Sequence, residues 1–517
     1  MTTTEAVDKK TTTEAVDKKT LWTVIWASSI GTLIEWYDFY LFGTLTAIIS
    51  VQFFPSDNPT AALLAALAAF AAGFLVRPFG ALFFGRLGDL IGRKYTFLVT
   101  LLIMGLSTVA IGLVPGYKTF AAAPFVILLL RLLQGLALGG EYGGAATYVS
   151  EHVTAKDRGY YTSFIQTTAT LGLFLALGVI WITKKQVGAE AFADWGWRIP
   201  FLISSVLVGV SVYIRLKMAE SPLFSKIKAE GKISANPLKE SFGKKENLKM
   251  VLLALFGATA GQGVVWYTGQ FYANSFIQNT LKVQDDQRIS LMLVAIALAT
   301  PFFVVFGGWS DKVGRKWIMM AGMLLAICTY FPIYKKMDSL ANSATKTVIV
   351  EQSTKTVKVS ADVKNPLDSI TTTAMKTNYT DGTYIEETKK ETKLADASKP
   401  AVKPDIKKTV WLNGSNYWLM MFLVFIQILY VTMVYGPIAA FLVELFPTRI
   451  RYTSMSLPYH VGNGIFGGLT PFIATALAAG GGAAKFNGLY YPIAIASLCL
   501  VIGTIFLSNK INEDVVD

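Results

Sequence analysis

The sequence predicts an all-α membrane protein of about twelve transmembrane helices, divided into two halves of six. Three observations lead to this fold class. The chain of 517 residues is 53% hydrophobic and only 16% charged, whereas a soluble chain carries about 25% charged residues. Apolar runs long enough to cross a bilayer recur along the chain. A short loop pattern also occurs twice, at equivalent places in the two halves.

The apolar runs give the transmembrane helices in order. A span needs roughly 17–25 mostly apolar residues. About twelve runs meet this requirement: Leu21–Phe53, Ala61–Phe84, Tyr95–Leu113, Phe120–Val149, Tyr161–Thr183, Ile199–Leu216, Leu248–Ile277, Ile289–Trp309, Trp317–Tyr334, Tyr417–Leu445, Ser454–Ala479 and Leu489–Leu507. An even number of spans places both termini on one side of the membrane.

Lysine and arginine are distributed unequally between the two sets of loops. One set holds Arg86, Arg93, Lys94, Lys156, Arg158, the segment 217–249, Lys312, Arg315, Lys316, Arg449 and Arg451. The opposite set of short loops holds only Lys118, Lys184, Lys185, Lys282, Arg288 and Lys485. The positive-inside rule therefore places the first set and both termini in the cytoplasm, with the chain multi-pass in the plasma (bacterial inner) membrane. Because the basic excess of +13 is spread between spans, it does not indicate nucleic-acid binding.

Composition divides the chain further. Residues 1–20 are a polar leader with TTTEAVDKK repeated, expected to be disordered and unlike a signal peptide. The first six-helix half covers 21–216, a cytoplasmic linker 217–247, the second half 248–508 and a cytoplasmic tail 509–517. A polar extracytoplasmic insertion, 335–413, interrupts the second half. Its stretch TVIVEQSTKTVKVSADV alternates like β-strands, so the insertion is either a small β-rich lobe or a disordered segment.

The repeated loop pattern follows the second and the eighth span. GRLGDLIGRK (Gly85–Lys94) and GGWSDKVGRK (Gly307–Lys316) both have a glycine, three residues, an aspartate, two residues and then GRK. Glycine allows a tight turn, aspartate caps a helix or pairs with a nearby arginine, and basic residues suit a cytoplasmic loop. Two such copies at equivalent positions indicate duplicated halves, which are a recurring architecture of transporters.

Further motifs extend this pattern over both halves: IEWYDFYLFG, RPFGALFFGRLGDLIGRK, RLLQGLALGGEYGGAATYVSEH, WGWRIPF, ESPLF and ELFPTRIRYTSMSLPYHVGNG. With these motifs the chain resembles the major facilitator superfamily, and within it the metabolite:proton symporter family of proline/betaine, citrate, 2-oxoglutarate and shikimate carriers. The resemblance implies two pseudo-symmetric six-helix bundles, a central substrate site and alternating access. It implies secondary active, proton-coupled uptake of a small organic metabolite. A non-transporting sensor on a transporter fold and an uncoupled facilitator are the alternatives.

Three titratable residues are candidates for proton coupling. Glu35 and Asp38 lie on one face of the first span, and a charge at mid-bilayer costs about 2.5–3.5 kcal/mol. We therefore expect both acids to face the interior of the bundle. They either carry the coupled proton or pair structurally with Arg77 or Arg131. His460 is the third candidate, and its alternative role is that of a hydrogen-bonded structural residue.

The candidates for substrate binding are one arginine and a polar, aromatic stretch in the seventh span. Arg131 in the fourth span suits a carboxylate substrate or a buried acid. Gln262 and Gln270 are eight residues apart and should share a helix face. Trp266 and Tyr267 could hold a quaternary amine by cation–π contact, or could be interfacial aromatics. The substrate is therefore expected to be a carboxylate or a zwitterion.

The resemblance assigns a gating role to the loop repeat, through which the two aspartates close the cytoplasmic side. We expect Arg77 to form a structural or gating pair and Glu141 to form a gate pair, because its small neighbours allow a second helix to approach. The gating candidates are Gly85, Asp89, Gly92, Arg93, Gly307, Asp311, Gly314, Arg315, Arg77 and Glu141.

The sequence carries no signature of enzyme chemistry. It has no nucleophile elbow or phosphate-binding P-loop, and Cys328 and Cys499 have no metal-ligand spacing. We therefore expect no enzyme activity, cofactor or bound metal. The expected partners are a small metabolite, protons and the lipid bilayer, and we expect the protein to act as a monomer.

Overall fold

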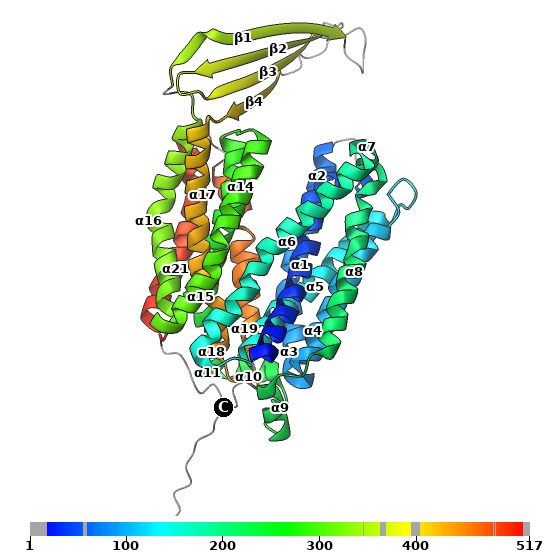
Figure 1. The fold of residues 1–517 in the computed structure, drawn as a ribbon, viewed down its shortest axis with the longest axis vertical. Helices are drawn as coiled ribbons and strands as arrows, with labels where there is room; N and C mark the ends of the chain where they lie inside the picture. The colour runs from blue at the N-terminus through cyan, green and yellow to red at the C-terminus, as the bar shows by residue number, and fades with distance from the viewer. Residues whose placement is uncertain are drawn as a thin grey trace, which may run out of the picture.

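The transmembrane part of the computed structural model consists of helices in two bundles that lie side by side (Figure 1). The structure describes residues 18–54, 59–344, 346–361, 369–393, 404–478, 480 and 482–509. Most of the predicted leader and tail therefore lies outside the described residues. Ten helices within these ranges are long and apolar enough to cross a membrane. Together with α1 (Lys18–Phe53) and α19–α20, they give the predicted twelve-helix, all-α fold.

The first bundle holds the first six spans. Its second span is broken at Val76, just before Pro78, because proline cannot continue the backbone hydrogen bonds of a helix. The spans are α1, α2 (Pro59–Leu75) with α3 (Arg77–Ile91), α4 (Arg93–Leu113), α5 (Ala123–Ser150), α6 (Arg158–Val187) and α8 (Arg198–Lys217). The short α7 (Ala189–Ala191) and the π-helical η2 (Phe192–Gly196) connect the last two.

Two short linker helices, α9 (Pro222–Ala229) and α10 (Pro237–Gly243), lead into the second bundle. Its seventh span combines α11 (Lys245–Ala254), η3 (Leu255–Thr259), α12 (Ala260–Tyr267), η4 (Thr268–Tyr272), α13 (Ala273–Ser275) and η5 (Phe276–Thr280). The remaining spans are α14 (Asp285–Ala299) with α15 (Pro301–Val313), α16 (Arg315–Ala341), α17 (Gly414–Tyr435) with α18 (Ile438–Leu445), α19 (Arg451–His460) with η6 (Val461–Gly467) and α20 (Thr470–Leu477), and α21 (Tyr490–Phe506), which η7 (Gly482–Leu489) precedes.

Of the two alternatives for the polar insertion, the described residues form an antiparallel sheet. Its strands are β1 (Val348–Ala361), β2 (Ser369–Tyr379), β3 (Tyr384–Lys393) and β4 (Asp405–Trp411), in that order across the sheet. Figure 1 shows the sheet above α16 and α17, at the end of the molecule opposite α9 and α10. We call these two ends the sheet side and the linker side.

The sheet is attached to the second bundle by its last strand. The N–H of Val410 donates to Lys282 at 2.8 Å, and its carbonyl accepts from Gln284 at 2.9 Å. The side-chain amide of Gln287 both donates to and accepts from the backbone of Leu412, at 2.9 Å each. The loop between the seventh and eighth spans therefore continues the sheet at β4.

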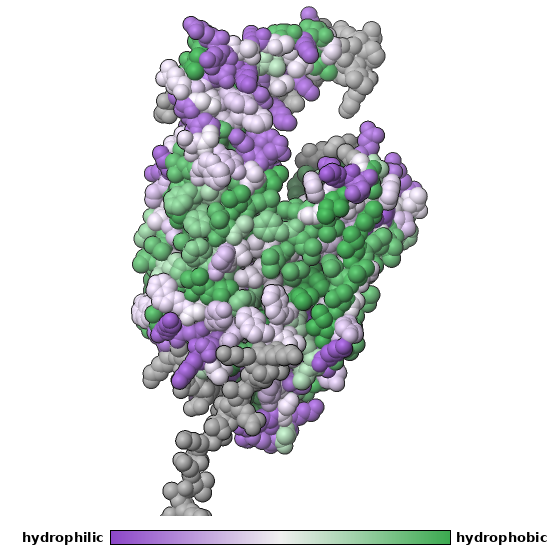
Figure 2. All heavy atoms as spheres, viewed as in Figure 1, coloured by the Kyte–Doolittle hydropathy of each residue, from purple (hydrophilic) through white to green (hydrophobic). Residues whose placement is uncertain are grey.

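Hydropathy follows the architecture. Figure 2 shows a band of apolar residues across both bundles, with hydrophilic residues gathered toward the two ends and on the sheet. Large apolar side chains within this band are exposed, such as Phe125 and Phe472, as expected for a surface that faces lipid. Glycines bring α3 and α5 into backbone contact: a Cβ on Gly139 would lie 2.2 Å from the carbonyl oxygen of Arg77. This close packing fixes α3 and α5 relative to each other.

Candidate functional site

A central cavity lies between the two bundles, with about 580 Å³ of empty space including its open mouth. Both halves of the chain contribute to its wall. The lining residues are Thr32, Glu35, Trp36, Phe39, Arg77, Leu138 and Tyr142 from the first bundle, and Trp266, Tyr267, Tyr435, Tyr459, His460 and Asn463 from the second. The cavity therefore depends on the relative position of the bundles.

Aromatic rings form much of this wall. Trp36 and Trp266 approach each other across the bundles, with ring centroids 5.9 Å apart. Tyr142 of α5 stacks on Tyr459 of α19 at 3.6 Å, with an angle of 3° between the ring planes. The hydroxyl of Tyr459 also forms a 2.5 Å hydrogen bond with Tyr435. We call these three residues the tyrosine stack, since they join the bundles at the cavity wall.

Arg77 is the arginine that reaches the cavity. Its guanidinium lies over the rings of Phe74 and Phe39, at 4.2 and 5.4 Å from their centroids. Among the described residues, no carboxylate lies within ion-pair distance of it. The structural or gating pair expected for Arg77 is therefore not observed among the described residues. Arg77 is the first residue of α3, and its side chain lines the cavity instead.

Arg131, in contrast, does not line the cavity. It is buried inside the first bundle, where it donates to Gln134 at 2.7 Å and to the carbonyl of Phe70 at 3.4 Å. Its guanidinium lies 4.4 Å from the centroid of Phe42. Spacing alone could not show which of the two arginines faces the centre, because both occupy apolar spans.

Glu35 belongs to a buried group of two acids and one arginine. Glu141 forms a 2.5 Å ion pair with Arg215 and accepts a 2.7 Å hydrogen bond from Thr100. Glu35 lies close enough to Glu141 and Arg215 to interact electrostatically with both, and its Oε1 has no hydrogen-bond partner. The expectation of a gate pair for Glu141 is wrong, since its ionic partner lies in α8 of the same bundle. Sequence reasoning missed Arg215 because it closely precedes the lysines of the linker.

Asp38 has a different environment. It is fully buried in the first bundle and accepts a 2.5 Å hydrogen bond from Ser204, and it is not among the residues that line the cavity. The structure gives neither acid an ion pair with Arg77 or Arg131, so the proposed structural pairing is not observed among the described residues. Of the two acids, only Glu35 lies at the cavity wall.

The other predicted residues divide between wall and interior. Trp266, Tyr267 and His460 line the cavity, and Nε2 of His460 has no hydrogen-bond partner. Gln262 is buried and exchanges hydrogen bonds of 3.1 and 2.9 Å with the lining residue Asn463. Gln270 is not part of the wall. Gln270 lies within the π-helical η4, whereas Gln262 lies in α12, and a π-turn changes which residues share a face.

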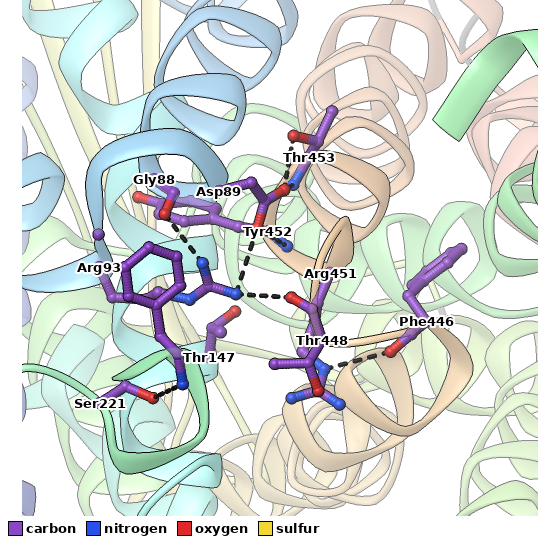
Figure 3. Close-up of polar contacts among 12 residues, drawn as sticks. Gly88, Asp89, Arg93, Thr147, Ser221, Phe446, Thr448, Arg451, Tyr452 and Thr453 are labelled. Atoms are coloured by element: carbon purple, nitrogen blue, oxygen red, sulfur yellow. Dashed lines mark hydrogen bonds and ion pairs between the residues drawn. The ribbon is translucent and has the colours of Figure 1, made fainter. Parts of the chain in front are cut away.

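The first copy of the loop repeat joins the bundles on the linker side (Figure 3). Asp89 of α3 accepts hydrogen bonds from the N–H groups of Tyr452 and Thr453, at 3.3 and 2.8 Å, and from the hydroxyl of Thr453 at 2.7 Å. It therefore caps the first turn of α19 across the interface. Arg93 lies 3.3 Å from Asp89 and donates to the carbonyl of Thr448 at 2.7 Å.

The second copy of the repeat makes the corresponding contact with the two bundles exchanged. Asp311 of α15 accepts from the N–H groups of Gly159 and Tyr160, at 2.8 and 2.7 Å, and so caps α6 of the first bundle. Arg315 lies 2.5 Å from Asp311. The glycines have two roles: Gly92 and Gly314 adopt φ of 127° and 95°, whereas Gly85 and Gly307 allow the opposite bundle to approach.

A second repeat, which sequence reasoning missed, carries crossed ion pairs. EHVTAKDR and ELFPTRIR each place an arginine seven positions after a glutamate. Glu151 pairs with Arg451 at 3.1 Å, and Arg158 pairs with Glu444 at 3.1 Å. Each glutamate therefore binds the arginine of the other half. The spacing was visible in the sequence, but its meaning depends on the two-fold arrangement of the bundles.

The motif ESPLF ties the linker to the same region. The carboxylate of Glu220 accepts from the N–H groups of Arg93 and Lys94, at 3.1 and 3.3 Å, and caps α4. The hydroxyl of Ser221 donates to Glu151, and the ring of Phe224 lies 4.5 Å from the guanidinium carbon of Arg93. We use the term linker-side network for the residues 89, 93, 151, 158, 220, 221, 311, 315, 444 and 451.

Comparison with known proteins decides the family. A family model described as "Sugar (and other) transporter" matches residues 23–236. The chain is 31% identical to an inner membrane metabolite transport protein of Escherichia coli (strain K12), over 92% of each chain. The chain belongs to the major facilitator superfamily. This transporter is also 36% identical to the alpha-ketoglutarate permease of E. coli (strain K12), over 62% of the chain and 73% of the permease. It is 33% identical to a proline/betaine transporter of Salmonella typhimurium (strain LT2), over 61% and 64%.

Solved structures agree on the fold. A structure of the proton:xylose symporter XylE matches with a TM-score of 0.69 and 15% identity, and covers 96% of this chain and 98% of that one. At this identity the match concerns the fold alone. By its family and its relatives, the chain is a membrane-embedded transporter of small molecules and not an enzyme. Its central cavity lies where the two bundles meet.

Proposed function

We propose that this protein takes up a small carboxylate or zwitterion together with a proton, by alternating access of the central cavity. One observation carries the proposal: Arg77 presents a guanidinium without an anionic partner to a cavity walled by aromatic rings. A buried cation is costly unless an anion compensates it. A substrate carboxylate supplies that anion, and a guanidinium binds it through two parallel hydrogen bonds.

The rest of the wall limits the substrate further. The rings of Trp36, Trp266 and Tyr267 suit an apolar body or a quaternary amine, which binds to aromatic faces by cation–π contact. Glu35 is the acidic residue of the wall and would compensate an ammonium group. The printed names of the relatives, alpha-ketoglutarate permease and proline/betaine transporter, include one substrate of each kind.

Glu35 is the group that we assign to the coupled proton. It borders the cavity, whereas Asp38 is enclosed in the bundle. Two carboxyl groups and a single guanidinium meet at Glu35, Glu141 and Arg215, so full ionisation would leave a net negative charge in a buried site. Uptake of a proton by Glu35 removes that charge. Protonation of Glu35 can thereby favour the change of the substrate-loaded carrier from one access state to the other, so that proton movement down its gradient drives uptake.

Alternating access is supported by the asymmetry of the contacts. The linker-side network and the tyrosine stack join the bundles on one side of the cavity. We assign the linker side to the cytoplasm because the short loops there carry the excess of lysine and arginine. The structure then corresponds to a carrier closed toward the cytoplasm. We expect a monomer to suffice, since one chain supplies both halves of the cavity wall.

The test is uptake into proteoliposomes, with and without an inward proton gradient. Labelled mono-, di- and tricarboxylates are screened beside proline and betaine, with wild type, Arg77→Lys, Glu35→Gln and the matched buried control Arg131→Lys. We expect gradient-driven accumulation of one class, impaired binding in Arg77→Lys and loss of gradient dependence in Glu35→Gln. Uptake that does not depend on the proton gradient would indicate an uncoupled facilitator. Binding without transport would indicate a sensor. A larger loss of substrate binding in Arg131→Lys than in Arg77→Lys would indicate that Arg131, and not Arg77, binds the carboxylate.

A further inference from the structure

The acid pair and Arg215 occupy a site with an unbalanced charge. Glu35, Glu141 and Arg215 are at most 3% exposed. Arg215 compensates one carboxylate, that of Glu141, at 2.5 Å. A second carboxylate at Glu35 would compete for the same guanidinium, because Coulomb attraction is strong where water is excluded. Each change in the protonation of Glu35 therefore changes the force on Arg215.

Arg215 is held by contacts that leave it little freedom. Its Nη1 donates to the carbonyl of Phe97 at 2.5 Å, and the guanidinium carbon lies 3.4 Å from the centroid of the Phe97 ring. Its Nη2 lies against Gly31, where a Cβ would be only 1.9 Å away. The missing side chain at Gly31 thus makes the space that Arg215 fills, and a force on the guanidinium must be passed to the backbone of α8.

The end of α8 leads directly into the linker-side network. Arg215 lies in the last turn of α8, and the carbonyl of Ala219 accepts a 2.6 Å hydrogen bond from Tyr148. Five positions after Arg215, Glu220 caps α4. Ser221 donates to Glu151, which holds Arg451 of the other bundle. Only a short segment of chain therefore separates the acid pair from the contacts that join the bundles.

We propose that Arg215 is a positioning residue that transmits the charge state of Glu35, through the end of α8, to the linker-side network. Loss of the Glu35 proton draws the guanidinium toward a second carboxylate, and the resulting shift of α8 weakens the contacts of Glu220 and Ser221. This inference deepens the proposed function and rests on its assignment of the proton to Glu35. It explains how a proton at the cavity wall can influence a gate made of different residues.

Other charged and titratable groups also face Glu35. They are Glu141 of α5, Arg215 of α8, Asp38 of α1, Arg77 of α3 and Tyr452 of α19, together with His460 on the same cavity wall. Of these groups, Glu141 and Arg215 form an ion pair with each other next to Glu35. Variants at Arg215 therefore separate transmission from the substrate site at Arg77.

The test reads the linker without requiring a substrate. Ile227 of α9 is 2% exposed and does not belong to the network. The reporter is Ile227→Cys in a protein whose Cys328 and Cys499 are replaced by serine. A membrane-impermeant maleimide labels this buried cysteine only when α9 separates from the residues packed against it, so the labelling rate measures that separation. Rates are measured against pH in liposomes for the reporter alone and with Glu35→Gln, Arg215→Gln, Arg215→Lys or Arg198→Gln. Arg198 is the matched control, because it lies at the opposite end of α8 and donates to Gly112 and Val114.

Maleimide reacts with the thiolate, whose fraction rises with pH, so each rate is divided by the rate of the same cysteine in the denatured protein at the same pH. We expect this ratio to rise severalfold for the reporter alone as the pH rises. Glu35→Gln and Arg215→Gln should abolish this pH dependence. Arg215→Lys should keep a pH dependence with a shifted midpoint, because lysine retains the positive charge. Arg198→Gln should leave the profile unchanged. A flat profile in the reporter alone, or a normal profile in Arg215→Gln, overturns the proposal. If Arg215→Gln does not fold, Arg215→Lys decides by the presence or absence of a shifted midpoint. Failure of every substrate in the uptake screen, with this profile intact, would refute the proposed transport and leave the transmission standing.

Discussion

Under the proposed function, Arg77 is a residue at which function and stability conflict. A guanidinium in a cavity without an anion is held at a cost in free energy. Replacement by glutamine should therefore leave the thermal stability unchanged or increase it, while substrate binding weakens by about 1.5–3 kcal/mol, or roughly 10–150-fold in Kd. Substrate titration and thermal unfolding of Arg77→Gln and Arg131→Gln in detergent check this. A large loss of stability in Arg77→Gln would instead indicate a structural role.

His460 lies on the same wall but has a different expected effect. Its ring packs edge-on against Tyr459 at a centroid distance of 5.1 Å, and no carboxylate is within ion-pair distance among the described residues. We expect His460→Gln to change the KM for substrate severalfold and to retain accumulation driven by the proton gradient. Uptake at several external pH values measures both. Loss of the gradient dependence in His460→Gln, with Glu35 unchanged, would instead assign the coupled proton to His460.

At the scale of single residues, the sequence predicted the types of groups better than their partners. Intramembrane acids and arginines were recognised by their cost in lipid, and Glu35, Trp266, Tyr267 and His460 do line the cavity. Periodicity could not decide between Arg77 and Arg131, because the direction of a side chain depends on how the helices pack. Arg215 was hidden at a helix end, where basic residues are common for reasons of topology.

At the scale of elements, helix caps connect the two bundles. Asp89 and Asp311 each cap the first turn of a helix in the opposite bundle. Loss of a cap typically costs about 0.5–2 kcal/mol. We therefore expect Asp89→Ala and Asp311→Ala to shift the population open on the linker side by about 2–30-fold. The measurement is labelling of Thr32→Cys, a cavity residue, from the linker side.

The two cap variants serve as controls for each other. Their contacts are related by the duplication, so a similar increase in labelling is expected for both. An increase in one variant alone would mean that only that loop closes the linker side. Unchanged labelling in both would contradict the gating role that the resemblance gives to the repeat.

The sheet is the element with the least connection to the cavity. Its β4 strand is held by the side-chain amide of Gln287, which forms two hydrogen bonds with the backbone of Leu412. Gln287→Ala should release this attachment locally by about 1–3 kcal/mol, seen as faster amide hydrogen exchange in β4. Transport should remain near the wild-type rate. A loss of uptake comparable to that of Arg77→Lys would show that the sheet takes part in transport.

Elements differ in how well the sequence predicts them. Span positions follow from apolar length, and the alternation of β1 was visible as a strand pattern. The π-helical segments of the seventh and eleventh spans were not predictable, since an inserted residue leaves no mark in hydropathy. Their consequence is specific: Gln262 reaches Asn463, whereas Gln270 leaves the shared face on which the simple helical spacing placed it.

At the scale of the whole molecule, the duplicated halves explain the arrangement of the linker side. Each half supplies an aspartate that caps a helix of the other half and a glutamate that pairs with an arginine of the other half. The aspartates were predicted from the repeated loop, and the glutamates were missed because their spacing has no meaning within one half. The interface on the linker side therefore consists of two similar parts.

This arrangement predicts a measurable coupling across the interface. Glu444 lies 3.1 Å from Arg158 and 3.0 Å from Arg315, and removal of one partner from a buried ion pair costs roughly 3–5 kcal/mol. Glu444→Gln should therefore strongly increase linker-side labelling of Thr32→Cys and reduce gradient-driven accumulation through leakage. In Glu444→Gln, Arg315 keeps its ion pair with Asp311 at 2.5 Å, whereas Arg158 loses its pair with Glu444. Adding Arg158→Gln removes this uncompensated charge and should therefore recover part of the closure. A double-mutant cycle gives the coupling energy of the pair. Strictly additive effects would show that Arg158 and Glu444 stabilise their own bundles, and that the bundles are held together by the helix caps and the tyrosine stack.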